Sequence, residues 1–411
     1  MPSTPETPLR IALVSLHTSP FTDPGSGDAG GMNVVVRHQA EALGALGHHV
    51  DVITRRSSPD MPAVSSPTEN VTLRVLDAGP AEVVPKGRHE EFIHEFRDRL
   101  AELGPYDVLH SHHWFSGMAA LPVARDRGIP HLQSFHSIAA DASTPLSHGE
   151  RPESHGRLEG EAFLAQNSDR VIAISQAERQ TIVTRLHGDP ERIVVVAPGV
   201  DTQLFHPVDD LDRPDEPFAL AAGRLEPLKG PDLAIDAIAA VASAVRPELV
   251  IAGGASTEFA DYERELRQRA TEAGIGDSVR FVGPQTRPHL AALLRRASVV
   301  LVPSHSETYG LIALEAAASG VPVVAADAGG LHEAVVDGVT GVIMTSREPA
   351  AWGLTVSRIL ADPQLAGSLG AAAREHALAR PWSRSAHELA DVYCGLSERP
   401  GVECRPEAVP V

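Results

Sequence analysis

Residues 299–330, VVLVPSHSETYGLIALEAAASGVPVVAADAGG, contain the pattern that decides the fold. The apolar run 299–302 predicts a buried strand, and the polar run 304–309 predicts a loop after it. Residues 310–320 are rich in good helix formers and end in glycine, which predicts a short helix. Residues 321–326 then predict a second strand. Such a β-loop-α-β unit places its loop at the carboxyl ends of parallel strands, where open α/β sheets bind ligands.

Two carboxylates flank the start of the predicted helix, Glu307 in the loop and Glu315 in the helix. The free backbone N–H groups after Gly310, together with the helix dipole, can hold a phosphate. Glu315 lies among apolar residues, and a buried acid needs a hydrogen-bonding partner, for which the diol of a ribose would serve. An anion site beside two acceptors for hydroxyl groups favours a sugar nucleotide.

The composition limits the classes of protein that this chain can be. Its 411 residues suffice for about two or three domains, and 43% of them are hydrophobic. A formal net charge of −19 disfavours general binding to nucleic acid or to an anionic membrane. No run approaches the length of a transmembrane helix, and the start, MPSTPETPLR, lacks an apolar signal core. Two cysteines are too few for a disulfide framework or a zinc cluster. We expect a soluble, cytoplasmic protein.

The first part of the chain has the order of a nucleotide-binding fold. Residues 10–16 predict a buried strand, 17–33 form a long glycine-rich loop, 34–47 predict a helix, and 50–54 predict a second strand. The loop matches neither GxGxxG nor a P-loop. Its glycine pair at 30–31 allows the backbone to approach a ligand closely, although the glycines alone are also compatible with a simple turn.

A second alternation of strands and helices predicts a second domain. We place an N-terminal Rossmann-like domain at 1–205, an acidic, proline-rich linker at 206–217, and a C-terminal Rossmann-like domain at 218–381. A last helix at 382–397 is expected to cross back to the N-terminal domain, and a tail follows at 398–411. The predicted fold class is α/β, with two doubly wound parallel sheets facing each other across a cleft.

Two cations follow the first strand of the second domain, in GRLEPLKG at 223–230. Arg224 and Lys229 lie at the carboxyl end of that strand, where both can reach a diphosphate. Arginine supplies a fork of donors, and lysine supplies a compact charge. The alternative is that both are solvated surface cations.

The histidines indicate a cleft rather than a metal centre. His110, His112 and His113 resemble a ligand set in spacing, but no Glu or Cys completes a zinc pattern and HEXXH is absent. We therefore expect no metal site. His17 and His136 each follow a predicted strand, which places them at the cleft. The absence of GxSxG disfavours a Ser-His-Asp hydrolase.

Three motifs together carry a family resemblance. The acids at 307 and 315 match the pattern EX7E, and they occur with GRLEPLKG at 223–230 and PGVD at 198–201. The chain thereby resembles the retaining glycosyltransferases of family 4, which have the GT-B fold. The stretch SLHTSPFTDPGSGDAGGMN at 15–33 is similar to one branch, the mycothiol-pathway glycosyltransferases of actinobacteria. That branch joins N-acetylglucosamine from UDP-GlcNAc to 1D-myo-inositol 3-phosphate. The likeness covers about residues 9–395.

The resemblance implies a donor site in the C-terminal domain and an acceptor site in the N-terminal domain. Donor binding is implied for Asp23, Pro24, Gly31, Arg224, Lys229, Gln285, Glu307, Gly310 and Glu315. Acceptor binding is implied for His17, Asp28, Asn33, Lys86, His113, Ser137 and Arg157, and catalysis for His136, Arg224, Lys229 and Glu307. His113 stands where the family has tyrosine, Ser137 stands where it has threonine, and the polar segment 139–150 departs from the family pattern.

The implied chemistry is a front-face displacement with retention. Arg224, Lys229 and the helix start stabilise the leaving diphosphate, Glu307 holds sugar hydroxyls, Glu315 holds the ribose, and His136 orients the reactants. The nucleotide sugar is a co-substrate, and the chemistry requires no cofactor. The resemblance neither implies nor excludes a structural magnesium ion. A homodimer is implied by analogy. One alternative is a family-4 enzyme that uses another UDP- or GDP-sugar and an aminocyclitol or small thiol. Another alternative is a non-catalytic regulator that binds a sugar nucleotide. The presence of all four groups at 224, 229, 307 and 315 disfavours it.

Overall fold

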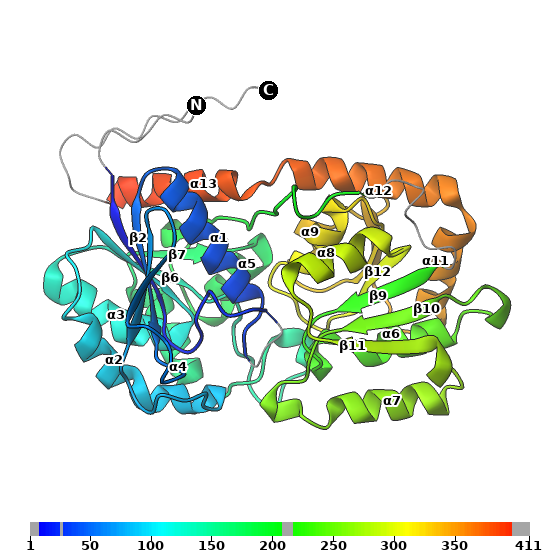
Figure 1. Ribbon diagram of the computed structural model, residues 1–411, viewed down its shortest axis with the longest axis horizontal. Coiled ribbons are helices and arrows are strands. Elements are labelled where there is room, and N and C mark those ends of the chain that lie inside the picture. Colours follow the sequence, from blue (N-terminus) through cyan, green and yellow to red (C-terminus); the bar gives the residue numbers. More distant parts are fainter. Residues whose placement is uncertain (1–7, 25–27, 208–216, 397–411) are drawn as a thin grey trace.

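The computed structural model describes residues 8–24, 28–207 and 217–396, which form two α/β lobes side by side (Figure 1). The predicted tail at 398–411 and most of the predicted linker at 206–217 lie outside the described residues. No helix in the described part of the chain is long and apolar enough to cross a membrane.

The sheet of the N-terminal lobe has eight strands in the order β3-β4-β2-β1-β5-β6-β7-β8. Its strands are β1 (Arg10–Ser15), β2 (His49–Arg55), β3 (Val64–Thr68), β4 (Val71–Leu76), β5 (Val108–His112), β6 (His131–Ser134), β7 (Arg170–Ala173) and β8 (Ile193–Val195). Only the edge strand β3 pairs in the antiparallel direction, with β4. The central strand β5 is buried at every position, because helices cover both faces of a parallel sheet.

Helices on both faces of this sheet complete the lobe. They are α1 (Gly31–Ala45), α2 (Ile93–Leu100), α3 (Trp114–Arg127), α4 (Arg157–Asn167) and α5 (Gln176–Arg185), with 3₁₀ turns at η1 (Lys86–Phe92), η2 (Leu146–His148) and η3 (Pro190–Arg192). Helix α1 begins at Gly31, three residues before the predicted start at 34. Asn33 explains the difference, because its Oδ1 accepts from the Gly30 N–H at 3.0 Å and its Nδ2 donates to the Ser19 carbonyl at 2.7 Å.

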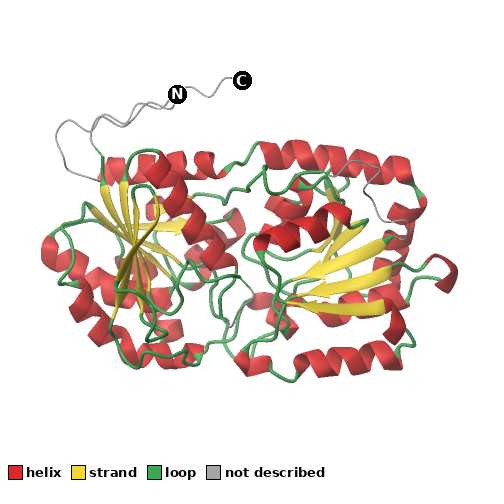
Figure 2. Ribbon diagram, viewed as in Figure 1, coloured by secondary structure: helices red, strands yellow, loops and turns green. Residues whose placement is uncertain are grey.

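The sheet of the C-terminal lobe has six parallel strands in the order β11-β10-β9-β12-β13-β14. Figure 2 shows the strands of this lobe in yellow with red helices around them. Its strands are β9 (Phe218–Ala222), β10 (Glu248–Ala252), β11 (Val279–Gly283), β12 (Val299–Val302), β13 (Val323–Ala326) and β14 (Gly341–Met344). Its helices are α6 (Pro231–Ala239), α7 (Tyr262–Glu272), α8 (Arg287–Arg296), α9 (Leu311–Ala318), α10 (Leu331–Ala334), α11 (Pro349–Ala361) and α12 (Pro363–Leu378), with 3₁₀ turns at η5 (Pro227–Lys229), η6 (Ser243–Val245), η7 (Thr257–Phe259) and η8 (Gly276–Ser278). Strands β9 and β12 are neighbours, which brings the loops after them together.

The last helix, α13 (Trp382–Leu396), returns to the N-terminal lobe and lies beside α1 (Figure 1). Ala386, Leu389 and Tyr393 belong to the apolar core that contains Leu9 and Ile11 of the first strand region. The chain therefore joins the two lobes twice, once before β9 and once before α13, which restricts how the lobes move relative to each other.

Candidate active site

A cavity of about 310 Å³ lies between the two lobes, at the carboxyl ends of the parallel strands of both sheets. Side chains that follow β1, β5 and β6 line it from the N-terminal lobe, and side chains that follow β9, β11 and β12 line it from the C-terminal lobe. Most of the residues predicted to form the site line this cavity: His17, Pro24, Asp28, Gly31, Asn33, Lys86, His113, His136, Ser137, Arg224, Lys229, Gln285, Glu307, Gly310 and Glu315.

Three predicted residues have a different position or task than the sequence suggests. Asp23 is exposed and does not line the cavity, and Arg157 is fully buried behind the cavity wall. Both polar atoms of the Asn33 side chain hold the glycine-rich loop, so Asn33 acts through the shape of that loop. Arg157 thus does not line the cavity, and its contact with the acceptor stays a prediction.

The loop between β12 and α9 presents Glu307 to the cavity. The Glu307 carboxylate accepts from Lys229 Nζ at 2.8 Å and from Ser304 Oγ at 3.3 Å. Gly310 precedes α9 with a φ of 101°, in the left-handed region that favours glycine, and a Cβ there would lie 2.5 Å from Leu331 Cδ2. The loop geometry thus sets a carboxylate beside the free N–H groups of the first turn of α9.

Glu315 points into the cavity from α9 and pairs with a residue that the sequence analysis missed. Its side chain is 5% exposed, and Arg287 Nη1 lies 2.8 Å from its Oε1. The Arg287 guanidinium also lies over the ring of Phe205, 4.7 Å from the centroid. A partner within the chain satisfies the buried acid, so a ribose is not needed for that purpose. Arg287 is the first residue of α8, and the helix dipole makes a cation unfavourable at a helix start. A cation in that position of the sequence could have indicated a nearby anion.

Arg224 connects the predicted donor side of the cavity to the opposite lobe. Its Nη2 lies 3.2 Å from Glu226 Oε1 and 3.5 Å from Glu150 Oε1 in the N-terminal lobe. A Cβ on Gly30, at the start of α1, would lie 3.7 Å from Arg224 Nε. The guanidinium therefore lies where the glycine pair of the N-terminal lobe faces the C-terminal lobe.

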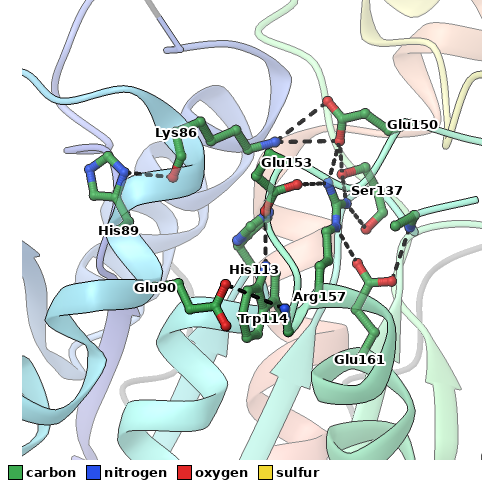
Figure 3. A network of polar contacts seen from close by, with 12 residues as sticks. Lys86, His89, Glu90, His113, Trp114, Ser137, Glu150, Glu153, Arg157 and Glu161 are labelled. Carbon is green, nitrogen blue, oxygen red and sulfur yellow. Dashed lines mark hydrogen bonds and ion pairs between the residues drawn. The ribbon is translucent and has the colours of Figure 1, made fainter. Parts of the chain in front are cut away.

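The end of the cavity that is predicted to bind the acceptor contains a carboxylate that the sequence analysis did not single out. Ser137 Oγ donates to Glu150 Oε2 at 2.7 Å, and Lys86 Nζ lies 3.4 Å from the same oxygen (Figure 3). Although burial opposes ionisation, Lys86, Arg157 and Arg224 hold the pKa of Glu150 well below its usual range. Glu150 is thus an anion in the position predicted to bind one. No local pattern indicates it, because two of its partners, Lys86 and Arg224, belong to distant segments of the chain.

The three cavity histidines are neutral at pH 7. Burial lowers the pKa of His136 to about 3 and the pKa values of His17 and His113 well below the usual range. His136 has a positive φ of 62°, and its ring Nε2 lies 2.9 Å from His112 Nδ1. The hydroxyl of Thr308 donates to the His136 carbonyl at 2.8 Å across the two lobes. His112, which was not predicted as a site residue, thus holds His136 in place.

Comparisons with known proteins identify the family. A model described as "Glycosyl transferases group 1" matches residues 206–376, and a "Glycosyl transferase 4-like domain" model matches residues 30–199. The chain is 38% identical to a D-inositol 3-phosphate glycosyltransferase of Stackebrandtia nassauensis, over 97% of this chain and 94% of that protein. It is 40% identical to the protein of the same name from Frankia alni, over 92% and 97% of the two chains.

A solved structure agrees with this result. The sucrose-phosphate synthase of Thermosynechococcus elongatus superimposes with a TM-score of 0.86 and 31% sequence identity, over 94% of this chain and 99% of that chain. The chain therefore belongs to the group 1 glycosyltransferases, in the family that includes the D-inositol 3-phosphate glycosyltransferases, and it has the GT-B fold.

Proposed function

We propose that this glycosyltransferase moves a sugar from a nucleotide-sugar donor to a hydroxyl group of a small polar acceptor, with retention of the anomeric configuration. UDP-GlcNAc is the first donor to test. The observation that carries the proposal is the convergence of Arg224, Lys229 and Glu307 on the cavity from the loops after β9 and β12, beside the first turn of α9. Two cations and a helix start suit a diphosphate, and a carboxylate beside them suits sugar hydroxyls.

The proposed reaction needs no covalent intermediate with the protein. The acceptor oxygen forms a bond to the anomeric carbon on the face from which the diphosphate leaves, and the bond from that carbon to the diphosphate oxygen breaks. The departing phosphate oxygen takes the proton of the acceptor hydroxyl. Arg224, Lys229 and the N–H groups after Gly310 stabilise the negative charge that develops on the leaving group.

His136 supports the reaction by position rather than by proton transfer. Its ring lines the cavity and is neutral, because burial lowers its pKa to about 3. Its ring contact with His112 and the hydrogen bond from the Thr308 hydroxyl to its backbone carbonyl hold it where the two lobes meet. We assign it to the orientation of the donor sugar and the acceptor.

Two acceptor classes compete, each with its own support. The relatives are named for inositol 3-phosphate, which supports 1D-myo-inositol 3-phosphate as the acceptor, and Lys86 and Ser137 line the cavity as that acceptor requires. A second candidate is an acceptor without a phosphate, such as an aminocyclitol or a small thiol. The observation that favours it is the Glu150 carboxylate at the position expected for a phosphate.

The test is a matrix of donors and acceptors with product detection by mass spectrometry. UDP-GlcNAc, UDP-glucose and GDP-mannose are each combined with inositol 3-phosphate, myo-inositol, an aminocyclitol and a small thiol. We expect one pair to yield a product whose anomeric configuration, measured by NMR, equals that of the donor. An inverted product overturns retention, and no transfer from any donor overturns the proposed function.

A pair of variants links the product to the cavity. Arg224→Ala is expected to abolish transfer, because it removes a cation from the leaving diphosphate. Arg264→Ala is the matched control, since that side chain is 75% exposed and its ion pair is with the equally exposed Asp261. Equal activity of both variants contradicts the diphosphate assignment.

A further inference from the structure

The Glu150 carboxylate lies at the point where the donors of the predicted phosphate site converge. Ser137 Oγ donates to its Oε2 at 2.7 Å, Arg157 Nη1 lies 3.2 Å from that oxygen, and Lys86 Nζ lies 3.4 Å from it. Arg224 Nη2 approaches Oε1 at 3.5 Å from the other lobe. Figure 3 shows Lys86, Ser137 and Arg157 directed toward this one carboxylate. A side chain of the protein thus fills the position of an anionic substrate group.

Arg157 has no guanidinium nitrogen that lacks an acceptor within the chain. Its Nε donates to Glu161 at 2.8 Å, and its Nη1 donates to Glu150 at 3.2 Å and to Glu153 at 2.5 Å. Its Nη2 donates to the carbonyl and the hydroxyl of Ser137 at 3.3 and 3.0 Å. The side chain is fully buried and does not line the cavity. A phosphate in the cavity would therefore have to break an existing set of charged hydrogen bonds to reach Arg157.

The charges in this part of the site balance without a substrate anion. Lys86, Arg157 and Arg224 are the cations, while the acids around them are Glu150, Glu153, Glu161 and Glu226. Burial raises the pKa of Glu161, but even without Glu161 three cations face three carboxylates. The neighbouring His113 stays neutral because burial lowers its pKa, so it adds no positive charge.

A second acid lies at the same end of the cavity. Asp28 lines the cavity and is within electrostatic range of Lys86, Arg224 and Glu150. With Glu150, it offers carboxylate oxygens to a ligand that brings N–H or O–H groups. A phosphate monoester brings a charge of about −1.5 to −2 at pH 7 and acceptor oxygens only, which like-charged neighbours disfavour.

We propose that Glu150 is the specificity-determining residue for the acceptor, and that it selects a ring that carries hydroxyl or ammonium groups and no phosphate at this position. This inference rests on the proposed function and names the substrate class of the same site. The acceptor donates hydrogen bonds to Glu150 and Asp28, while Lys86 and Arg157 hold the Glu150 carboxylate in place. The structure thereby assigns the aminocyclitols and neutral cyclitols as the acceptor class.

Binding is measured by calorimetry on the full chain saturated with UDP, so that the result does not depend on turnover. The probes are 1D-myo-inositol 3-phosphate, myo-inositol and a monoamino-inositol. For the wild type we expect the amino compound to bind at least tenfold tighter than the phosphate. Glu150→Gln keeps the size of the side chain and removes its charge, so we expect the order of these two affinities to reverse. Glu159→Gln is the control, because that residue is exposed on α4, the helix that follows Glu150 and begins at Arg157.

Each outcome decides the proposal. Tighter binding of inositol 3-phosphate to the wild type overturns it, and so does an unchanged affinity ratio in Glu150→Gln when the UDP affinity and melting temperature of the variant are normal. Failure of all three probes to bind the wild type and the variant overturns it as well. If UDP itself does not bind, the proposed function fails separately, and the two results are thereby distinguished.

Discussion

Lys229 Nζ lies 2.8 Å from Glu307 Oε2, although the two residues are 78 positions apart in the sequence. Lys229 follows β9 and Glu307 follows β12, and these strands are neighbours in the C-terminal sheet. The predicted diphosphate ligand and the predicted sugar ligand therefore form an ion pair when no substrate is present. We expect a bound nucleotide sugar to exchange this pair for contacts of the diphosphate with Lys229 and of the sugar hydroxyls with Glu307.

This relationship predicts opposite effects of Glu307→Gln on turnover and on nucleotide affinity. The variant loses a charged hydrogen-bond acceptor for the sugar, so we expect kcat to fall about 10- to 100-fold. Lys229 is released from its ion pair, so the affinity for UDP is expected to stay equal or to rise. Steady-state kinetics and calorimetry with UDP measure both. The exposed Glu258→Gln serves as control, and an unchanged kcat in Glu307→Gln would refute the role of Glu307.

Arg287→Ala is expected to destabilise the C-terminal lobe. The substitution leaves the Glu315 carboxylate without its partner at 5% exposure, and breaking a buried pair in this way costs roughly 3 kcal/mol. The comparison is Arg280→Ala, whose ion pair with Glu248 at 2.8 Å has side chains that are 50% and 40% exposed and is worth less than about 1 kcal/mol. Urea unfolding measures both variants. Adding Glu315→Gln to Arg287→Ala should restore part of the loss, and equal effects of the two arginine variants contradict the prediction.

Gly310→Ala is expected to disturb the start of α9. The position has a φ of 101°, and the added Cβ would meet Leu331 Cδ2 at 2.5 Å, so strain of roughly 1–3 kcal/mol is expected. Because the loop must shift, the affinity for UDP should fall along with the melting temperature. Gly367→Ala in α12 meets open space and is the matched control, with a neutral or slightly stabilising effect. If Gly310→Ala binds UDP as tightly as the wild type, the start of α9 is not part of the diphosphate site.

Glu178→Gln is expected to change how stability depends on pH. Burial raises the pKa of Glu178 from 4.5 to about 7, although the Ile174 N–H donates to its Oε2 at 2.6 Å. Between these two pH values the folded state keeps a proton that the unfolded state releases, so the wild type loses stability as pH rises from 4.5 to 7. Glutamine does not titrate, and the variant should gain on the order of 3 kcal/mol relative to the wild type by pH 8.

Thermal melting of both proteins at several pH values tests this. The buried histidines act in the opposite direction, since their lowered pKa values remove stability as pH falls below 6.5, but they are present in both proteins. The difference between the two melting temperatures therefore isolates Glu178. A difference that does not grow from pH 4.5 to 7 contradicts the raised pKa.

Local patterns were enough to predict the elements around the central stretch. The apolar run, the helix formers and the closing glycine in 299–330 correspond to β12, α9 and β13 in the structure. They suffice because burial on both faces and helix propensity act over a few neighbouring residues. The edge strand β3 shows the limit, since Ser65, Ser66 and Pro67 give it no strand signal and only its pairing with β4 makes it one.

By itself, the sequence determined the α/β class and the two repeated lobes. It also placed Arg224, Lys229, Glu307 and Gly310 at strand ends around one cavity, because strand order places those loops at one edge. Only the tertiary structure decided the partners of the charged side chains. The Arg287–Glu315 pair and the contacts of Glu150 join segments that are distant in the sequence. Hydrogen bonds and ion pairs depend on separations of a few ångströms in space, which no spacing along the chain records. The acceptor end of this enzyme is therefore decided by the packing of its two lobes.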